Sequence, residues 1–128
     1  IDELTGDIPL VLVMNLNSSM VWSEIEPSAD AILVSFGGGR THSARDEILF
    51  EIIAGNYEPS ALLPMQQPID METVEAQYED VPRDMDCYVD ADGNTYDFTF
   101  GLNWSGVIDD ERVAKYNVEP IVGTNPLE

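Results

Sequence analysis

Two nearly continuous apolar runs near the start of the chain predict buried β-strands. The first covers Ile8–Leu16, and the second covers Ala31–Phe36 and stops at three glycines. Uninterrupted apolar runs of this length are typical of strands buried on both faces, as in parallel sheets. Val21–Ala29 lies between them and predicts a short helix with Ser18 or Ser19 as its cap. These elements predict a right-handed βαβ unit.

Apolar residues recur with helical spacing after the glycine run. The pattern extends from Ile48 to Ile53. Ser43 and Asp46 approximate a capping box ahead of it. Gly55 follows at the position of a left-handed C-cap residue. We therefore expect a second helix that ends at Gly55.

The next residues predict a stiff turn followed by an edge strand. Pro59 prevents the helix from resuming and fixes a turn. Leu62–Met65 contains a proline, which edge strands tolerate and central strands do not. The predicted sheet then has three strands, whereas sheets usually have about five or six. We expect the missing strands to come from another copy of the chain or from polypeptide outside this sequence.

The chain becomes strongly acidic from Asp70 to Asp97 and shows little helical periodicity there. Cys87–Val89 and Thr95–Phe98 flank the dipeptide Asp92–Gly93, which is a strong hairpin signal. We expect a β-hairpin at this position.

These patterns together predict one α/β domain. It is expected to be a partial α/β sandwich, with a few-stranded, mostly parallel sheet, flanking helices and a β-hairpin. Residues 8–68 would form the core, residues 69–104 an acidic hairpin and an aromatic segment that packs on the core, and residues 105–128 a tail. One or two helical turns are expected within Asp109–Tyr116, before an extended end. A length of 128 residues and a hydrophobic share of 44% fit a single folded domain.

The net charge of −20 excludes several classes of partner. Such a surface repels phosphate backbones and anionic lipids, so we expect no nucleic-acid or membrane role. No apolar run reaches the ~20 residues of a membrane helix, and Ile1–Gly6 does not resemble a signal peptide. The first residue is not methionine, which predicts a cut piece or a processed product.

The loop between the second strand and the second helix is a candidate ligand site. It contains Arg40 and His42, and ligands of open α/β sheets bind at the carboxyl ends of strands. These two side chains either contact a substrate or line the start of the helix. The loop matches neither G-x-G-x-x-G nor a P-loop, so we expect no cofactor. His42 is the single histidine, which excludes a His-rich zinc site.

Three other features have competing interpretations. Asp90, Asp92 and Asn94 are spaced like calcium ligands, but the required glycine and glutamate are absent, so a hairpin turn is favoured over a weak cation site. Trp22 and Trp104 belong either to the core, which is favoured, or to a sugar-stacking platform. Cys87 is a single cysteine, which excludes an internal disulfide and leaves the compartment open. We expect it to be a packed strand residue rather than a nucleophile.

Two loop segments resemble glycoside hydrolase family 3, the β-glucosidase and β-xylosidase family. Asn56–Pro64, with the sequence NYEPSALLP, is similar to the N-P-S-G-x-L-P segment of that family. Tyr96–Trp104, with the sequence YDFTFGLNW, resembles its Y-P-F-G-Y-G-L-S-Y segment. Ala31–Leu33 and Asp46–Phe50 resemble a strand and the helix that follows it. The similarity covers most of the chain.

This resemblance implies a division of labour between domains. In such enzymes an N-terminal (β/α)8 barrel carries an aspartate nucleophile, and an α/β-sandwich domain helps close the pocket. The acid/base glutamate usually lies upstream of the strand matched here by Ile8–Leu16. The chain would therefore be the later part of the C-terminal domain and hold neither catalytic carboxylate. Ala61 replaces a glycine of the family, and Gly37–His42 lacks the proline and glutamate of its P-G-x-E-x-G loop.

The functional expectation is a fragment of a β-glucosidase-like hydrolase that acts on β-linked glycosides with a retaining mechanism. The chain would supply scaffold and a wall of the substrate pocket, and would be inactive alone. Its expected partners are the barrel of the parent chain, a carbohydrate substrate and further copies of itself. The resemblance favours an extracellular or periplasmic location. The alternative is a non-catalytic carbohydrate-binding or protein-interaction domain.

Overall fold

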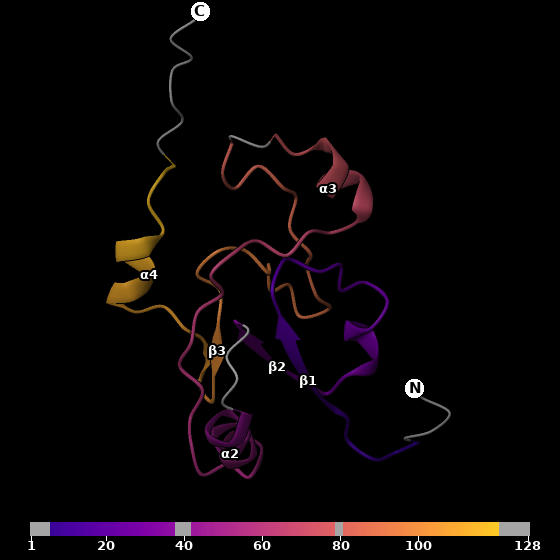
Figure 1. The fold of residues 1–128 in the computed structure, drawn as a ribbon, viewed down its shortest axis with the longest axis vertical. Helices are drawn as coiled ribbons and strands as arrows, with labels where there is room; N and C mark the ends of the chain where they lie inside the picture. Colours follow the sequence, from indigo (N-terminus) through magenta and orange to yellow (C-terminus); the bar gives the residue numbers. More distant parts are fainter. Residues whose placement is uncertain (1–5, 38–41, 79–80, 121–128) are drawn as a thin grey trace, which may run out of the picture.

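The computed structural model describes residues 6–37, 42–78 and 81–120, with the backbone alone for residues 42–45. β1 (Val11–Leu16) and β2 (Ala31–Phe36) form a two-stranded parallel sheet (Figure 1). Val11 pairs with Ala31 at one end and Leu16 pairs with Phe36 at the other. The predicted parallel pair is confirmed.

The two faces of this sheet differ in burial. Leu16 is 8% exposed and belongs to a core cluster, against which Met14 and Val34 pack from the same face. Val11 and Val13 alternate with these residues and are 36% and 46% exposed. The expectation of strands buried on both faces is therefore wrong for the described residues, because no described element closes over the second face.

The connection between the strands is a turn rather than an α-helix. The backbone carbonyl of Trp22 accepts hydrogen bonds from the amides of Ile25 and Glu26, at 3.0 and 2.9 Å. A single 3-10 turn, η1 (Glu26–Ser28), follows. The predicted helix is wrong because Pro27, which lacks a backbone N–H, limits the segment to one turn.

The second helix, α2 (His42–Ile53), is confirmed, and its C-terminus forms as predicted. Gly55 has φ +77 and donates to the carbonyl of Ile52 at 3.0 Å, while Asn56 donates to Glu51 at 2.9 Å. This pair of bonds is a Schellman motif, in which a left-handed glycine ends the helix.

The start and the exposed face of α2 differ from expectation. The helix begins at His42, so Ser43 is a helical residue rather than its cap. Ile48, Phe50 and Ile53 are each at least 45% exposed. Figure 1 shows α2 at the bottom of the view and α3 in its upper part, with β1 and β2 between them.

The predicted edge strand at Leu62–Met65 does not join the parallel sheet. Leu63 instead donates its amide to the carbonyl of Phe100 at 2.7 Å and accepts from the amide of Thr99 at 2.9 Å. The segment therefore pairs with the aromatic segment. The predicted place at the edge of the parallel sheet is wrong. The proline shows that the segment can lie at the edge of a sheet, but it does not determine which strand the segment pairs with.

The β-hairpin is confirmed. Val89 and Thr95 form an antiparallel bridge, and Gly93 in the turn has φ +84. The segment around Gln67 lies against this hairpin. The backbone amide of Gln67 donates to the carbonyl of Tyr96, and its carbonyl accepts from the amide of Tyr88, both at 2.9 Å.

Two short helices and one small hairpin complete the described fold. α3 (Met71–Ala76) was not predicted, and its N-cap is Asp70, whose carboxylate accepts from the amide of Thr73 at 2.8 Å. β3 (Leu102–Asn103) and β4 (Gly106–Val107) form a small antiparallel hairpin that was not predicted either. The predicted helical turns are confirmed as α4 (Glu111–Tyr116). The end of the expected tail, from residue 121, lies outside the described residues.

An aromatic cluster organises the core. Trp22 is 2% exposed, and Tyr96 meets it edge-on with ring centroids 6.4 Å apart. Phe100 stacks on Tyr96 at 5.3 Å, so the first part of the aromatic segment packs on the core as expected. The core position favoured for Trp104 is wrong, because this residue is 60% exposed in the turn between β3 and β4. In the part of the chain that is described, no helix has the length and apolar character needed to cross a membrane.

Candidate functional site

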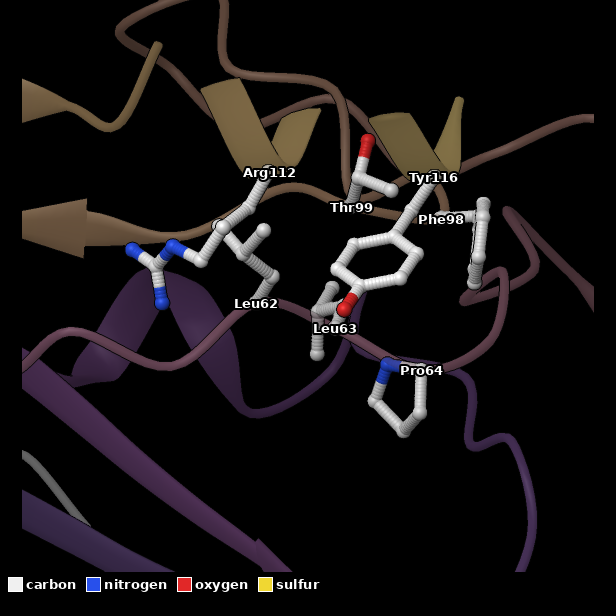
Figure 2. A pocket seen from close by; sticks show the side chains of 7 residues that line it. All are labelled: Leu62, Leu63, Pro64, Phe98, Thr99, Arg112 and Tyr116. Carbon is white, nitrogen blue, oxygen red and sulfur yellow. The ribbon is translucent and has the colours of Figure 1, made fainter. Parts of the chain in front are cut away.

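A hollow of about 410 Å³ opens where the Leu62–Pro64 segment meets α4. Phe98 and Thr99 form part of its wall, and Arg112 and Tyr116 reach it from α4 (Figure 2). The site is thus built from three stretches that are distant in the sequence.

Close backbone contact brings two of these stretches together. A Cβ placed on Gly101 would meet the carbonyl oxygen of Ala61, so only glycine allows this approach. The paired hydrogen bonds between Leu63 and the Thr99–Phe100 backbone lie beside it. The segments that meet here are the same two that resemble the family 3 motifs.

Arg112 fastens α4 to this junction. Its Nε lies 3.1 and 3.0 Å from the two carboxylate oxygens of Asp110, and its Nη2 donates to Oδ2 at 2.7 Å. Its Nη1 donates to the carbonyl of Ser60 at 2.7 Å. These hydrogen bonds hold the pKa of Asp110 below its ordinary value and raise the pKa of Arg112. Arg112 is therefore an anchor whose guanidinium is already engaged, rather than an open ligand for an anion.

Thr99 has a strained backbone in the wall of the hollow. Its φ is +72 and its side chain is enclosed, with 5% exposed. A left-handed conformation is a genuine outlier for a β-branched residue and costs roughly 1–3 kcal/mol. Such strain is characteristic of functional sites, where surrounding contacts hold it in place.

The chemistry of the hollow is mostly apolar. Figure 2 shows the ring of Tyr116 over Leu63, with its hydroxyl directed toward Leu63 and Pro64. The described lining residues include no Asp or Glu. Glycoside hydrolysis commonly uses a pair of carboxyl groups that flank the bond, so the described lining does not hold that machinery.

The structure leaves both predicted substrate contacts untested. Arg40 lies outside the described residues. His42 is the first residue of α2, and its side chain is not described. β2 ends at Phe36, so His42 does occupy the expected position after the carboxyl end of a strand.

The acidic turn at Asp90 is a hairpin turn, as favoured. Its Oδ1 accepts from the amides of Asp92 and Asn94 at 3.0 and 2.8 Å, and its Oδ2 accepts from the Asn94 side chain at 2.8 Å. The carboxylate is thus engaged by N–H donors. Within residues 6–37, 42–78 and 81–120, no group of three or more His, Cys, Asp or Glu is placed to hold a metal ion.

Cys87 is a packed residue, as expected. Burial, followed by the nearby Asp97 carboxylate, raises the pKa of its thiol to about 11. The Gln66 side chain donates to its sulfur at 3.3 Å. The thiol therefore stays protonated near neutral pH and is a poor nucleophile.

Sequence reasoning missed Thr99, Arg112 and Tyr116. No local signal marks Thr99, because threonine does not favour a positive φ. Asp110 preceding Arg112 by two residues was a usable signal, since Asp110 caps α4 by accepting from the Arg112 amide at 2.9 Å. Only the fold shows that the same arginine reaches Ser60.

Comparison with known proteins gives one partial relative. The chain is 29% identical, over 82 residues, to a protein named β-glucosidase C from Emericella nidulans. The match covers 64% of this chain and 12% of that protein, so the chain spans a small part of its relative. No protein-family model matches, and no solved structure matches. The similarity relates the chain to a β-glucosidase, while membership of glycoside hydrolase family 3 has no family-model support.

Proposed function

We propose that the chain is a part of a β-glucosidase-like glycoside hydrolase, corresponding to the later part of its C-terminal α/β-sandwich domain. The similarity to β-glucosidase C carries the proposal. The contact of Gly101 with Ala61 supports it, because this contact joins the two segments that resemble motifs of one enzyme family.

The role of this part is scaffold and wall of the substrate pocket. The lining of the described hollow is mostly apolar and lacks carboxylates, and we assign the nucleophile and the acid/base group to the rest of the parent polypeptide. That parent acts on β-linked glycosides with retention, through a glycosyl-enzyme intermediate. Its N-terminal barrel and the carbohydrate are the partners of this domain.

Arg40 and His42 are proposed substrate contacts in the parent. They follow β2 in the sequence, and His42 begins α2, so we assign them to the edge at the carboxyl ends of the strands, where parallel sheets bind ligands.

The test uses the complete polypeptide that contains this chain. It should hydrolyse an aryl β-glucoside, and NMR should show the β-anomer of the sugar as the first product. His42→Ala in that polypeptide should raise KM for the glucoside, whereas Glu119→Ala, far along the chain, should not. A complete polypeptide without hydrolysis, or with the α-anomer as first product, would contradict the proposal.

The alternative is a non-catalytic carbohydrate-binding domain. The observation that favours it is Trp104, which is 60% exposed rather than buried in the core. Sugar binding by the complete polypeptide with no bond cleavage would favour this alternative over the hydrolase.

A further inference from the structure

The two tryptophans of the chain have opposite environments. Trp22 is 2% exposed and its indole N–H donates to the Gln67 side chain at 2.9 Å. Trp104 is 60% exposed, between β3 and β4. The sequence allowed each tryptophan to be either a core residue or part of a sugar-stacking surface. Trp22 is a core residue, while Trp104 presents a large apolar ring to solvent. A ligand that covers this ring gains hydrophobic free energy.

The turn that carries Trp104 is held in place by several contacts. Asn103 pairs with Gly106 across the hairpin, and the Asn103 side-chain oxygen accepts from the amide of Ser105 at 2.8 Å. The amide of Trp104 donates to the Glu58 carboxylate at 3.3 Å. The base of the ring is therefore fixed before a ligand arrives, which lowers the ordering cost of binding.

A carboxylate suited to sugar hydroxyls contacts the backbone of the residue that carries this ring. Glu58 is exposed, and one of its two carboxylate oxygens holds the Trp104 amide. Tyr57, the residue before it, is 56% exposed. An exposed aromatic ring whose backbone is bonded to a carboxylate offers the two kinds of group that a pyranose uses, because a pyranose has an apolar C–H face and a rim of hydroxyl donors. The net charge of −20 disfavours anionic ligands, whereas a neutral sugar meets no such repulsion.

We propose that the β3–β4 turn is a carbohydrate-binding site, in which a neutral pyranose ring stacks on Trp104 and donates hydroxyl hydrogen bonds to Glu58. Trp104 and Glu58 are different residues from the proposed substrate contacts Arg40 and His42. The choice of β-linked glucose oligomers as its ligand rests on the proposed function, whereas stacking requires only a neutral pyranose.

The first test is a titration of the 128-residue chain with cello-, xylo- and malto-oligosaccharides, followed by NMR of the two indole N–H groups. The Trp104 signal should shift and saturate, while the Trp22 signal, held by Gln67, should stay in place. Binding of malto- but not cello-oligosaccharides would support the stacking site and count against the β-glucoside ligand, which keeps the two proposals distinguishable.

Substitutions then assign the contacts. Trp104→Ala should abolish binding, and Trp104→Phe should retain weaker binding. Glu58→Gln keeps an acceptor for the Trp104 amide but loses the charge, so the affinity should fall about three- to tenfold. Tyr78→Ala is the matched control, because this aromatic side chain is 74% exposed on another segment and should leave binding unchanged.

Three results would overturn the proposal. The Trp104 signal does not move with any of the oligosaccharides; Trp104→Ala binds them as tightly as the parent sequence; or Trp104→Ala abolishes self-association in sedimentation while the sugars have no effect. The last result would make the turn a protein-docking contact.

Discussion

At the residue scale, the buried Gln67 side chain fixes the position of Trp22 in the core. It is 1% exposed, and its Oε1 accepts hydrogen bonds from the Trp22 indole at 2.9 Å and from the Met20 amide at 3.1 Å. Its Nε2 has no partner among the described residues. Leaving a buried donor unpaired costs about 1–3 kcal/mol. The two accepted bonds offset that cost, and they fix Trp22 in the core.

Tyr88 and Cys87 predict a loss of stability at alkaline pH. Burial and the hydrogen bond to Glu26 raise the pKa of Tyr88 from 10.0 to about 12, and burial with Asp97 raises the pKa of Cys87 from 9.0 to about 11. The folded chain thus holds these protons more tightly than the unfolded chain. Their contribution is fully present below about pH 9 and is lost as the pH rises toward about 12.

Urea unfolding at a series of pH values checks this prediction. The free energy of unfolding should fall steadily from about pH 9 upward. Glu26→Gln removes the charge that faces the Tyr88 hydroxyl, so tyrosinate absorbance should develop at lower pH in this variant. An unfolding free energy that stays constant over the alkaline range would contradict the assignment.

At the scale of elements, the sequence predicted those helices, strands and turns that depend on residues close together in the chain. The apolar runs of β1 and β2, the glycine after α2 and the Asp92–Gly93 turn all identified their elements. α3 was missed because its single clear signal, the capping residue Asp70, lies within an acidic segment without helical periodicity. The hollow beside α4 was not predictable, because backbone pairing across distant segments and a positive φ at Thr99 create it.

Gly101→Ala tests the junction between these segments. The new Cβ would meet the carbonyl oxygen of Ala61, and backbone atoms yield less readily than a flexible side chain. We expect a loss of about 1–3 kcal/mol in the free energy of unfolding, measured by urea denaturation. Gly93→Ala is the comparison, since its Cβ meets no atom within 4 Å and its effect comes from φ +84 alone. Full stability of the Gly101→Ala chain would show that the junction does not hold the two segments at this distance.

At the scale of the whole molecule, the described sheet is incomplete. β1 and β2 pair only with each other among the described elements, and Val13 is 46% exposed on the open face. Parallel sheets are normally covered on both faces, so this face and the free strand edges favour association. The charge of −20 opposes association between identical chains.

The open sheet face favours association and the net charge opposes it, so we predict that self-association of the chain depends on salt concentration. At physiological ionic strength, where the Debye length is about 8 Å, like charges are screened and copies of the chain should associate. Lowering the salt should dissociate them. Analytical ultracentrifugation at several salt concentrations measures both effects. A chain that sediments as a monomer at high concentration and physiological salt would count against the open sheet as an interface.

The most direct measurement is an aryl β-glucoside hydrolysis assay on the 128-residue chain itself. If the reacting carboxylates belong to the remainder of a β-glucosidase-like parent, as the acid-free lining of the described hollow leads us to propose, the chain alone should give no turnover above the uncatalysed rate. Saturable turnover by the purified chain would contradict the account, because the reacting groups would then lie within these residues.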